Sequence, residues 1–269
     1  MPTLKPLISP SSVSLTDDDA RPPGSVPKGE AADLALVPLL EELTMWQAKL
    51  GAEEKRALLV VLQGRDASGK DGVIRKIFGP LNSATCVVSS FKRPSLLELQ
   101  HDFLWRVHHV VPPAGTVGVF NRSHYEDVLV VRVHSLVPEK LWRKRYRHIN
   151  EFERLLTDHG VTILKFFLHI STEEQQERLE ARLADPTKNW KFELGDLAER
   201  ALWGKYTEAY EEALTECSTE HAPWYLVPAD KKGPRDVMIA EVLVDALEKM
   251  KPEFPPADPE ILKLKGTIT

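Results

Sequence analysis

The feature that most constrains the fold of this chain is a glycine-rich loop directly after an apolar run. The apolar residues 57–63 are followed by residues 64–72, which read GRDASGKDG. This is the G-x-x-x-x-G-K spacing, in which backbone N–H groups converge on an anion at the start of a helix. The pattern predicts a strand, a phosphate-binding loop and a helix that reaches about Leu81. The alternative is a chance glycine turn between a strand and a helix.

Two acidic residues distinguish this loop from that of nucleotide hydrolases. Asp71 stands where those enzymes carry a serine or threonine hydroxyl for the metal, and Asp66 lies inside the loop. Two carboxylates would repel a phosphate unless a cation intervenes, so we predict a metal-dependent phosphoryl site. Lys70 is expected to add a full positive charge. The expected phosphate contacts in the loop are Gly64, Ala67, Ser68, Gly69, Lys70 and Asp71.

Length and charge limit the classes of function. A chain of 269 residues fits one large α/β domain. The net charge of −5 does not indicate nucleic-acid or membrane binding, so we expect neither partner. There is no apolar run of membrane-spanning length and no signal peptide, and the two cysteines lack metal-ligand spacing. We therefore expect free thiols and a cytoplasmic protein, in which a local basic cluster must hold any polyanionic ligand.

Strand-like and helix-like segments alternate along the chain. This order predicts an α/β fold of three layers, with a parallel central sheet covered by helices on both faces. Residues 1–30 contain six prolines and predict either a disordered tail or an arm draped over a neighbour. Residues 31–250 form the predicted folded domain, and residues 251–269 form a C-terminal tail.

A second polar cluster follows the buried strand that ends at Phe120. Residues 121–127 read NRSHYED, and ligands of parallel sheets bind at this edge. Asn121 stands where many P-loop proteins carry a metal-linked aspartate, and it can coordinate without adding charge. The Arg122 guanidinium can fork onto phosphate oxygens, or it can be the structural partner of a loop carboxylate. Glu126 either selects the nucleotide or begins a solvated helix.

Five histidines could suggest a zinc site or a phosphohistidine: His108, His109, His124, His134 and His148. No pair of them lies in a recognised ligand frame with a cysteine or carboxylate. We therefore interpret each as a structural histidine.

A basic segment follows the fourth predicted strand. Arg178 and Arg182 are four residues apart and share one helix face, and Asp185-Pro186 ends that helix. The segment predicts a helical lid over about residues 178–195 that closes over phosphates and excludes water. The alternative is a solvated helix paired with its own glutamates. The expected lid contacts to phosphate are Arg178, Arg182, Lys188 and Lys191.

Three motifs together resemble the family-2 polyphosphate kinases. They are residues 64–72, residues 120–127 and the basic segment 182–191, and they occur in the order of that family over about residues 30–250. The resemblance implies a P-loop kinase fold like that of thymidylate kinase, with a helical lid. It also implies reversible, Mg²⁺-dependent phosphoryl transfer between inorganic polyphosphate and nucleotides.

The resemblance also assigns roles to individual residues. Asp66, Lys70, Arg122 and Arg182 match the positions that bind metal and phosphate or support transfer. Many relatives carry an aspartate at the position of Asn121, which leaves Asp66 as the better anchor for Mg²⁺, or for Mn²⁺ as the alternative metal. The NRSHYE form resembles the subgroup that accepts nucleoside mono- and diphosphates. The expected nucleotide contacts are Asn121, Arg122 and Glu126, and further polyphosphate contacts are Lys92 and Arg93.

The leading hypothesis is a polyphosphate:AMP/ADP phosphotransferase that forms ADP and ATP, with guanine nucleotides as further candidate acceptors. The alternative is an ATP-dependent nucleoside monophosphate kinase, which an assay with ATP as sole donor would separate. A third hypothesis is a catalytically silent polyphosphate-binding protein, against which the acidic Asp66 argues. A homodimer or homotetramer is expected. The sequence determines neither the preferred base nor the favoured direction of transfer.

Overall fold

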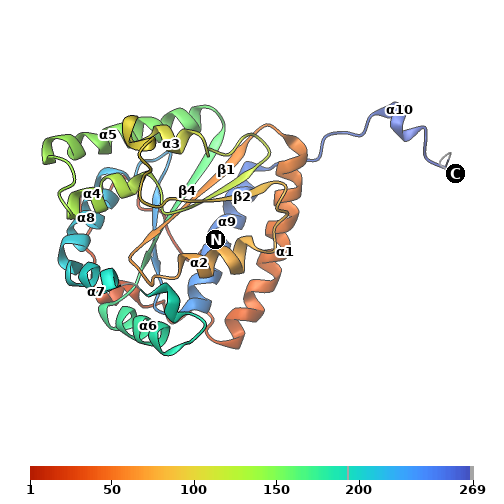
Figure 1. The fold of residues 1–269 in the computed structure, drawn as a ribbon. Coiled ribbons are helices and arrows are strands. Elements are labelled where there is room, and N and C mark those ends of the chain that lie inside the picture. Colours follow the sequence, from red (N-terminus) through yellow and green to blue (C-terminus); the bar gives the residue numbers. More distant parts are fainter. Residues whose placement is uncertain (193, 267–269) are drawn as a thin grey trace.

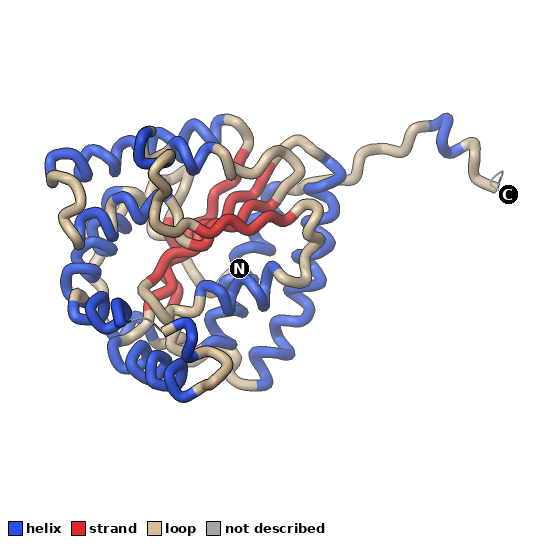
Figure 2. The backbone as a smooth tube through the Cα atoms, viewed as in Figure 1, coloured by secondary structure: helices blue, strands red, loops and turns tan. Residues whose placement is uncertain are grey.

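The computed structural model describes residues 1–192 and 194–266, and it is built around one parallel sheet (Figures 1 and 2). The strand order is β2-β3-β1-β4-β5, and every neighbouring pair is parallel. The predicted parallel sheet with helices on both faces is therefore confirmed. The strands are β1 (Ala57–Gly64), β2 (Cys86–Ser90), β3 (Val117–Asn121), β4 (Val161–His169) and β5 (Trp224–Pro228).

Helices connect the strands and form the two outer layers (Figure 1). The helices are α1 (Glu30–Glu53), α2 (Lys70–Val73), α3 (Trp105–His108), α4 (Val130–Val133), α5 (Glu139–Asp158), α6 (Thr172–Ala184), α7 (Leu194–Ala201), α8 (Trp203–Glu216), α9 (Lys232–Met250) and α10 (Pro259–Leu262). Among the short helical turns, three bear on the site: η2 (Ile74–Phe78), η4 (His124–Asp127) and η5 (Asn189–Lys191).

Strand β1 joins the two layers because its side chains alternate between them. Leu58 belongs to the apolar cluster that α1 and α9 form with one face of the sheet. Leu59 belongs to the cluster that α5 and α8 form with the other face. All eight residues of β1 are buried, which is typical of a central parallel strand. Burial of each such side chain stabilises the fold by about 1.5–3 kcal/mol, and the phosphate loop begins directly after this rigid strand.

The helix after the loop is shorter than predicted. It passes at Ile74 into the wider π turn η2 and ends before Leu81. The N–H of Gly79 donates to the carbonyl of Ile74 at 3.0 Å, and a Cβ at Gly79 would lie 2.4 Å from the carbonyl oxygen of Arg75. Only glycine fits this close approach, and the helix ends here because the next residue, Pro80, has no N–H to donate.

The proline-rich N-terminal segment packs on its own domain. Leu7 forms an antiparallel bridge with Trp224 of β5, and the N–H of Asp230 donates to the carbonyl of Ala20 at 3.1 Å. Leu15 and Ala20 are buried. Of the two alternatives, the structure shows an arm rather than a disordered tail, because the few apolar side chains of the segment find a folded surface beside β5. The arm lies along the chain's own sheet edge, and its predicted contact with a neighbour stays a prediction.

The C-terminal tail leaves the domain after α9. Lys251 adopts a left-handed conformation (φ 49°), and the chain then extends away from the sheet and carries only the short α10 (Figure 1). Within the described ranges 1–192 and 194–266, no helix is both long and apolar enough to cross a membrane.

Candidate active site

The two predicted clusters meet at the carboxyl ends of β1 and β3. Leu62 of β1 lies in register with Asn121 of β3, and the N–H of Arg122 donates to the carbonyl of Leu62 at 3.0 Å. Strand β1 lies between β3 and β4, with β2 and β3 on one side of it and β4 and β5 on the other. Open α/β sheets bind ligands where the strand order changes direction in this way. A hollow of about 320 Å³ at the opposite edge, near Arg56 and His159, contains none of the predicted site residues.

The conformation of the phosphate loop depends on small residues. A Cβ at Gly64 would lie 2.6 Å from the carbonyl oxygen of Leu168, so the loop can pass close to β4 only with glycine there. Gly69 has φ 96°, and a Cβ at this position would lie 2.1 Å from Nη1 of Arg235. Ala67 also has a positive φ of 61°. The loop is therefore a tight turn directly before α2, as the motif predicts.

The Lys70 ammonium lies inside the loop. Its Nζ donates to the carbonyl oxygens of Gly64 at 2.7 Å and Arg65 at 3.1 Å, and it lies 3.4 Å from Oγ of Ser68. Burial and the nearby Arg122 guanidinium lower the pKa of Lys70 to about 8, although neighbouring carboxylates partly offset this effect. The lysine thus supports the loop in addition to the phosphate contact expected of it.

Asp66 extends from the loop toward α6. Its Oδ2 accepts a hydrogen bond from Nη1 of Arg182 at 3.0 Å, and the same guanidinium lies 3.4 Å from Oδ2 of Asp196 in α7. Burial raises the pKa of Asp66, but the charges of Arg182 and Lys70 outweigh burial and lower it. Asp66 is therefore ionised at neutral pH and can bind a cation.

The loop after β3 faces this carboxylate with two further pairs. Nδ2 of Asn121 donates to Oδ1 of Asp71 at 2.9 Å. The Arg122 guanidinium lies 3.7 Å from Oε2 of Glu126. The Glu126 charge raises the pKa of Arg122, and this effect outweighs burial, which lowers it. The structural alternative predicted that Arg122 pairs with a carboxylate of the phosphate loop. In the structure Arg122 pairs with Glu126 instead. The Glu126 side chain is only 17% exposed, so it does not begin a solvated helix.

Arg178 of α6 contacts the backbone of the phosphate loop. Its Nη1 donates to the carbonyl of Ala67 at 2.8 Å, its Nη2 to the carbonyl of Ala229 at 2.6 Å, and its Nε to Oε1 of Glu174 at 2.8 Å. These bonds hold the phosphate loop against α6 and against the residue after β5. The predicted contact of Arg178 with phosphate stays a prediction.

The remaining predicted cations lie further out. Lys92 and Arg93 are exposed after β2, and neither side chain forms an ion pair with residues 1–192 or 194–266. Lys188 is exposed and pairs with Asp185. The Lys191 side chain lies outside the part of the chain that the structure describes. The structure therefore shows no side-chain contact of Lys92, Arg93 or Lys188 with the phosphate loop, and the predicted contact of Lys191 stays a prediction.

Sequence reasoning missed two arginines that touch the loop. Arg235 at the start of α9 is buried, its Nε donates to Asp236 at 2.8 Å, and its guanidinium packs against Gly69. Arg65 stacks on the ring of Trp203 at 3.8 Å and donates to Thr207, so it ties the loop to α8. Arg65 stood inside the motif and could have been found. Arg235 lies far along the chain and carries no local signal.

The interpretation of the histidines as structural stays a prediction. In the described part of the chain, no group of three or more histidine, cysteine and acidic side chains is arranged to hold a metal. His124 is buried, and its ring lies 3.3 Å from Oε1 of Glu153. This contact is what a structural histidine makes.

Comparison with protein families identifies the group to which this site belongs. The model described as "Polyphosphate kinase 2 (PPK2)" matches residues 28–255, which contain both loops and the whole segment predicted to form a lid. The chain belongs to the polyphosphate kinase 2 family. The sequence resemblance and the P-loop kinase fold are thereby confirmed.

Several relatives and solved structures of this family are similar along most of the chain. An AMP/ADP-polyphosphate phosphotransferase of Meiothermus ruber is 54% identical over 84% of this chain and 85% of its own. An ADP-polyphosphate phosphotransferase of Rhodopseudomonas palustris is 44% identical over 85% of both chains. The crystal structure of polyphosphate kinase 2 from Arthrobacter aurescens TC1 has a TM-score of 0.90 at 39% identity, and covers 96% of this chain and 94% of that one.

Proposed function

We propose that this chain is a polyphosphate:AMP/ADP phosphotransferase, which moves a phosphoryl group from inorganic polyphosphate to AMP or ADP and forms ADP or ATP. The observation that carries the proposal is the meeting of Asp66, Lys70, Arg122 and Arg182 at one sheet edge. It is supported by 54% identity to a relative named AMP/ADP-polyphosphate phosphotransferase. The names of the relatives do not favour the alternative, an ATP-dependent nucleoside monophosphate kinase.

The oxygen donors at the site suit Mg²⁺. Asp66 and Asp71 supply carboxylates, and Asn121 supplies an amide oxygen. Mg²⁺ is usually held by one or two carboxylates together with substrate phosphates and water. Such a site needs no cluster of protein ligands, in keeping with the lack of one among the described residues. We infer that Asp66 holds Mg²⁺, or Mn²⁺ in its place, and that the metal neutralises phosphate charge when bound.

The protein's own contribution to transfer is positioning and charge. An oxygen of the acceptor phosphate attacks the terminal phosphorus of polyphosphate in line, and the bond to the next bridging oxygen breaks. Lys70, Arg122 and Arg182 stabilise the negative charge that spreads over the transferred oxygens. No covalent intermediate with a side chain is required.

The outer residues complete the proposal. Asn121, Arg122 and Glu126 bind the nucleotide, and Glu126 contributes to its selection. A basic track binds the polyphosphate chain through Lys92, Arg93, Arg178, Lys188 and Lys191. We further propose guanine nucleotides as additional acceptors, a homodimer or homotetramer, and a cytoplasmic location in keeping with two free cysteines.

The experiment that tests this function compares donors and acceptors. ATP formation is measured from ADP, and separately from AMP, with long-chain polyphosphate and Mg²⁺. Phosphorylation of AMP is measured in parallel with ATP as the sole donor. Products that depend on polyphosphate support the proposal. Turnover with ATP alone would establish the alternative kinase, and polyphosphate binding without any product would establish the silent binding protein.

A further inference from the structure

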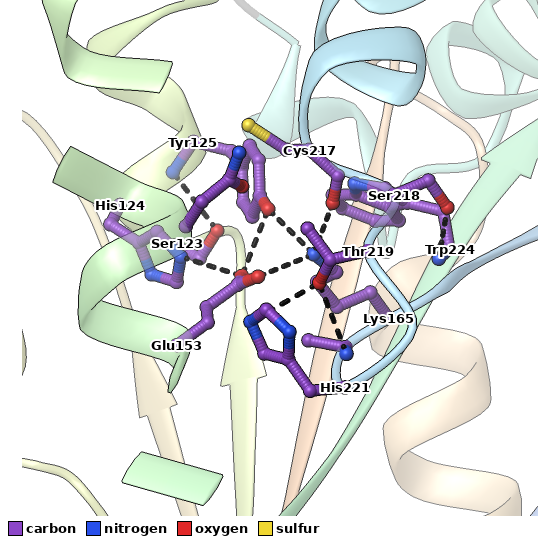
Figure 3. Close-up of polar contacts among 12 residues, drawn as sticks. Ser123, His124, Tyr125, Glu153, Lys165, Cys217, Ser218, Thr219, His221 and Trp224 are labelled. Carbon is purple, nitrogen blue, oxygen red and sulfur yellow. Dashed lines mark hydrogen bonds and ion pairs between the residues drawn. The ribbon is translucent and has the colours of Figure 1, made fainter. Parts of the chain in front are cut away.

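A pair of buried charges lies beneath the loop that follows β3. Lys165 of β4 and Glu153 of α5 are at most 1% exposed, and Nζ lies 2.6 Å from Oε2 (Figure 3). The residues next to Lys165 along β4 are apolar, and the pair lies under a large apolar cluster. A buried ion pair is often no more stabilising than apolar side chains of similar size, so stability alone explains it poorly.

All three hydrogens of the Lys165 ammonium have acceptors. Besides Glu153, they bond to Oη of Tyr125 at 2.8 Å and to the carbonyl of Cys217 at 2.6 Å. An ammonium group has three donors, so none is left for solvent or ligand. Glu153 in turn accepts from Oη of Tyr125 at 2.8 Å, and its Oε1 lies 3.3 Å from Nε2 of His124. The two charges therefore converge on Tyr125 and His124.

These contacts fix the protonation of Glu153 and Tyr125. Burial raises the pKa of Glu153, but the contacts with Lys165 and His124 together outweigh burial and lower the pKa, so the carboxylate remains ionised. Burial and the adjacent Glu153 raise the pKa of Tyr125, so the phenol keeps its proton. At neutral pH the Glu153 carboxylate is thus a fixed acceptor, and the Tyr125 phenol keeps the proton that it donates.

The two residues that contact this ion pair, His124 and Tyr125, lie in the loop after β3. His124 and Tyr125 begin η4, so they stand between Arg122 and Glu126 in the chain. The N–H of Tyr125 donates to Oγ of Ser123 at 3.2 Å, which closes the turn. The Tyr125 ring packs edge-to-face on Trp224 with centroids 4.7 Å apart. The loop is therefore anchored in the core through the two residues that the proposed chemistry does not use.

The backbone of Arg122 explains why such an anchor is needed. Arg122 has φ 61°, in the left-handed region that non-glycine residues rarely adopt. Conformations of this kind persist where the surrounding structure over-determines them. The N–H of Arg122 is held by the carbonyl of Leu62 on one side, and the anchored Tyr125 follows three residues later. Together the two restraints set the direction of the Arg122 side chain.

We propose that Glu153, Lys165, Tyr125 and His124 form a positioning device that holds Arg122 and Glu126 in their working geometry. The device touches no substrate, and its role in transfer rests on the proposed function. Loss of the anchor is expected to misplace Arg122, which lowers kcat. It is expected to leave the binding of polyphosphate to the rest of the site intact.

The first test removes only the Tyr125 hydroxyl. Tyr125→Phe keeps the ring on Trp224 and leaves Glu153 and Lys165 paired. The matched control is Tyr146→Phe, which removes another tyrosine hydroxyl from the same apolar cluster. In the described residues, the hydroxyl of Tyr146 makes no hydrogen bond to residues 121–127. We expect kcat to fall on the order of 10- to 100-fold in Tyr125→Phe, with KM for polyphosphate within about twofold and an unchanged control.

A second variant removes both charges but keeps an acceptor for the Tyr125 hydroxyl. In Glu153→Gln/Lys165→Met, the new amide oxygen can still accept from Tyr125, whereas the three bonds of the Lys165 ammonium are lost. If the pair of Glu153 and Lys165 only stabilises the fold, a variant with the wild-type Tm also has the wild-type kcat. The positioning device predicts a lowered kcat at that Tm. If this double variant does not fold, the comparison of Tyr125→Phe with Tyr146→Phe decides the question.

A readout without catalysis separates this proposal from the proposed function. Amide hydrogen exchange of residues 121–127 is measured in wild type, Tyr125→Phe and Tyr146→Phe without substrate. The positioning device predicts faster exchange of this segment in Tyr125→Phe alone, even if the wild type proves inactive with polyphosphate. Equal exchange in the two variants, or equal kcat where activity is present, overturns the proposal.

Discussion

The loop after β3 and the segment between α6 and α7 both carry residues of the proposed site, but they are held in opposite ways. The first is anchored by the buried pair Glu153–Lys165, whose side chains are at most 1% exposed. The second is held at the surface, where Lys188 is 64% exposed in its pair with Asp185. Buried, fully bonded groups fix geometry, whereas exposed pairs add little and weaken with salt. From this comparison we expect that changes at the inner loops affect transfer and that changes at the outer segment affect donor binding.

The largest effect is expected at the inner edge, from Lys70→Ala. The variant loses the charge over the transferred phosphoryl group, so kcat falls on the order of 10²- to 10³-fold. It also loses bonds to the carbonyls of Gly64 and Arg65, so we expect Tm to fall by a few degrees. Kinetics and thermal unfolding are compared with Lys76→Ala, which removes an exposed lysine paired with Asp33. Turnover equal to that control contradicts the site.

Asp66→Asn should act through the metal. The amide keeps the shape but not the charge, so we expect activity to fall on the order of 100-fold and the Mg²⁺ concentration at half-maximal rate to rise. Rates are measured across an Mg²⁺ series. Asp196→Asn is the matched control, because it also neutralises an acidic partner of Arg182. An unchanged Mg²⁺ dependence in Asp66→Asn would make Asp66 a structural loop residue.

The pH dependence should come from the inner loop as well. The pKa of Lys70 is lowered to about 8, so the free enzyme loses the ammonium proton as the pH rises through that value. We therefore expect kcat/KM for polyphosphate to decline above pH 8, about tenfold per unit, because this ratio reports the free enzyme. Bound phosphate favours the charged lysine, so the decline in kcat should begin at higher pH. Identical profiles for kcat/KM and kcat would exclude Lys70 as the titrating group.

The smallest effects are expected at the outer segment. Lys188→Ala should raise KM for polyphosphate a few-fold at low salt and leave kcat and the nucleotide KM unchanged. Arg178→Ala, on the same proposed track but bonded to Ala67 and Ala229, should lower both Tm and kcat. Saturation curves at low and moderate salt distinguish the two variants. If both behave alike, the contrast between inner and outer residues fails.

Sequence reasoning reached those parts of the structure that local patterns encode. The apolar run and the glycines of residues 64–72 predict β1, its loop and the start of α2, because each is specified within a few residues. Asp66 and Lys70 were found for the same reason. Arg235 reaches the loop from α9, and no local pattern indicates which distant side chain will do so.

Two other features were harder to predict for different reasons. Lys165 lies within the apolar run of β4, and a lysine there is itself a signal that a buried partner exists, although not which one. The N-terminal arm is too polar to fold alone, and composition therefore left two alternatives open, a disordered tail or an arm packed on another surface. Its order depends on the finished sheet edge, which is a property of the whole domain.

The N-terminal arm is also expected to limit aggregation of the protein. An uncovered strand at the edge of a sheet offers unpaired N–H and C=O groups to any other chain. The arm occupies this edge from Leu7, which bridges to Trp224, to Ala20, which accepts from Asp230. Proteolytic removal of the first twenty or so residues would leave every proposed site residue in place and yet expose a template for strand addition. Clipped preparations should therefore precipitate sooner than the full-length chain, while the fraction that stays in solution keeps its turnover per molecule.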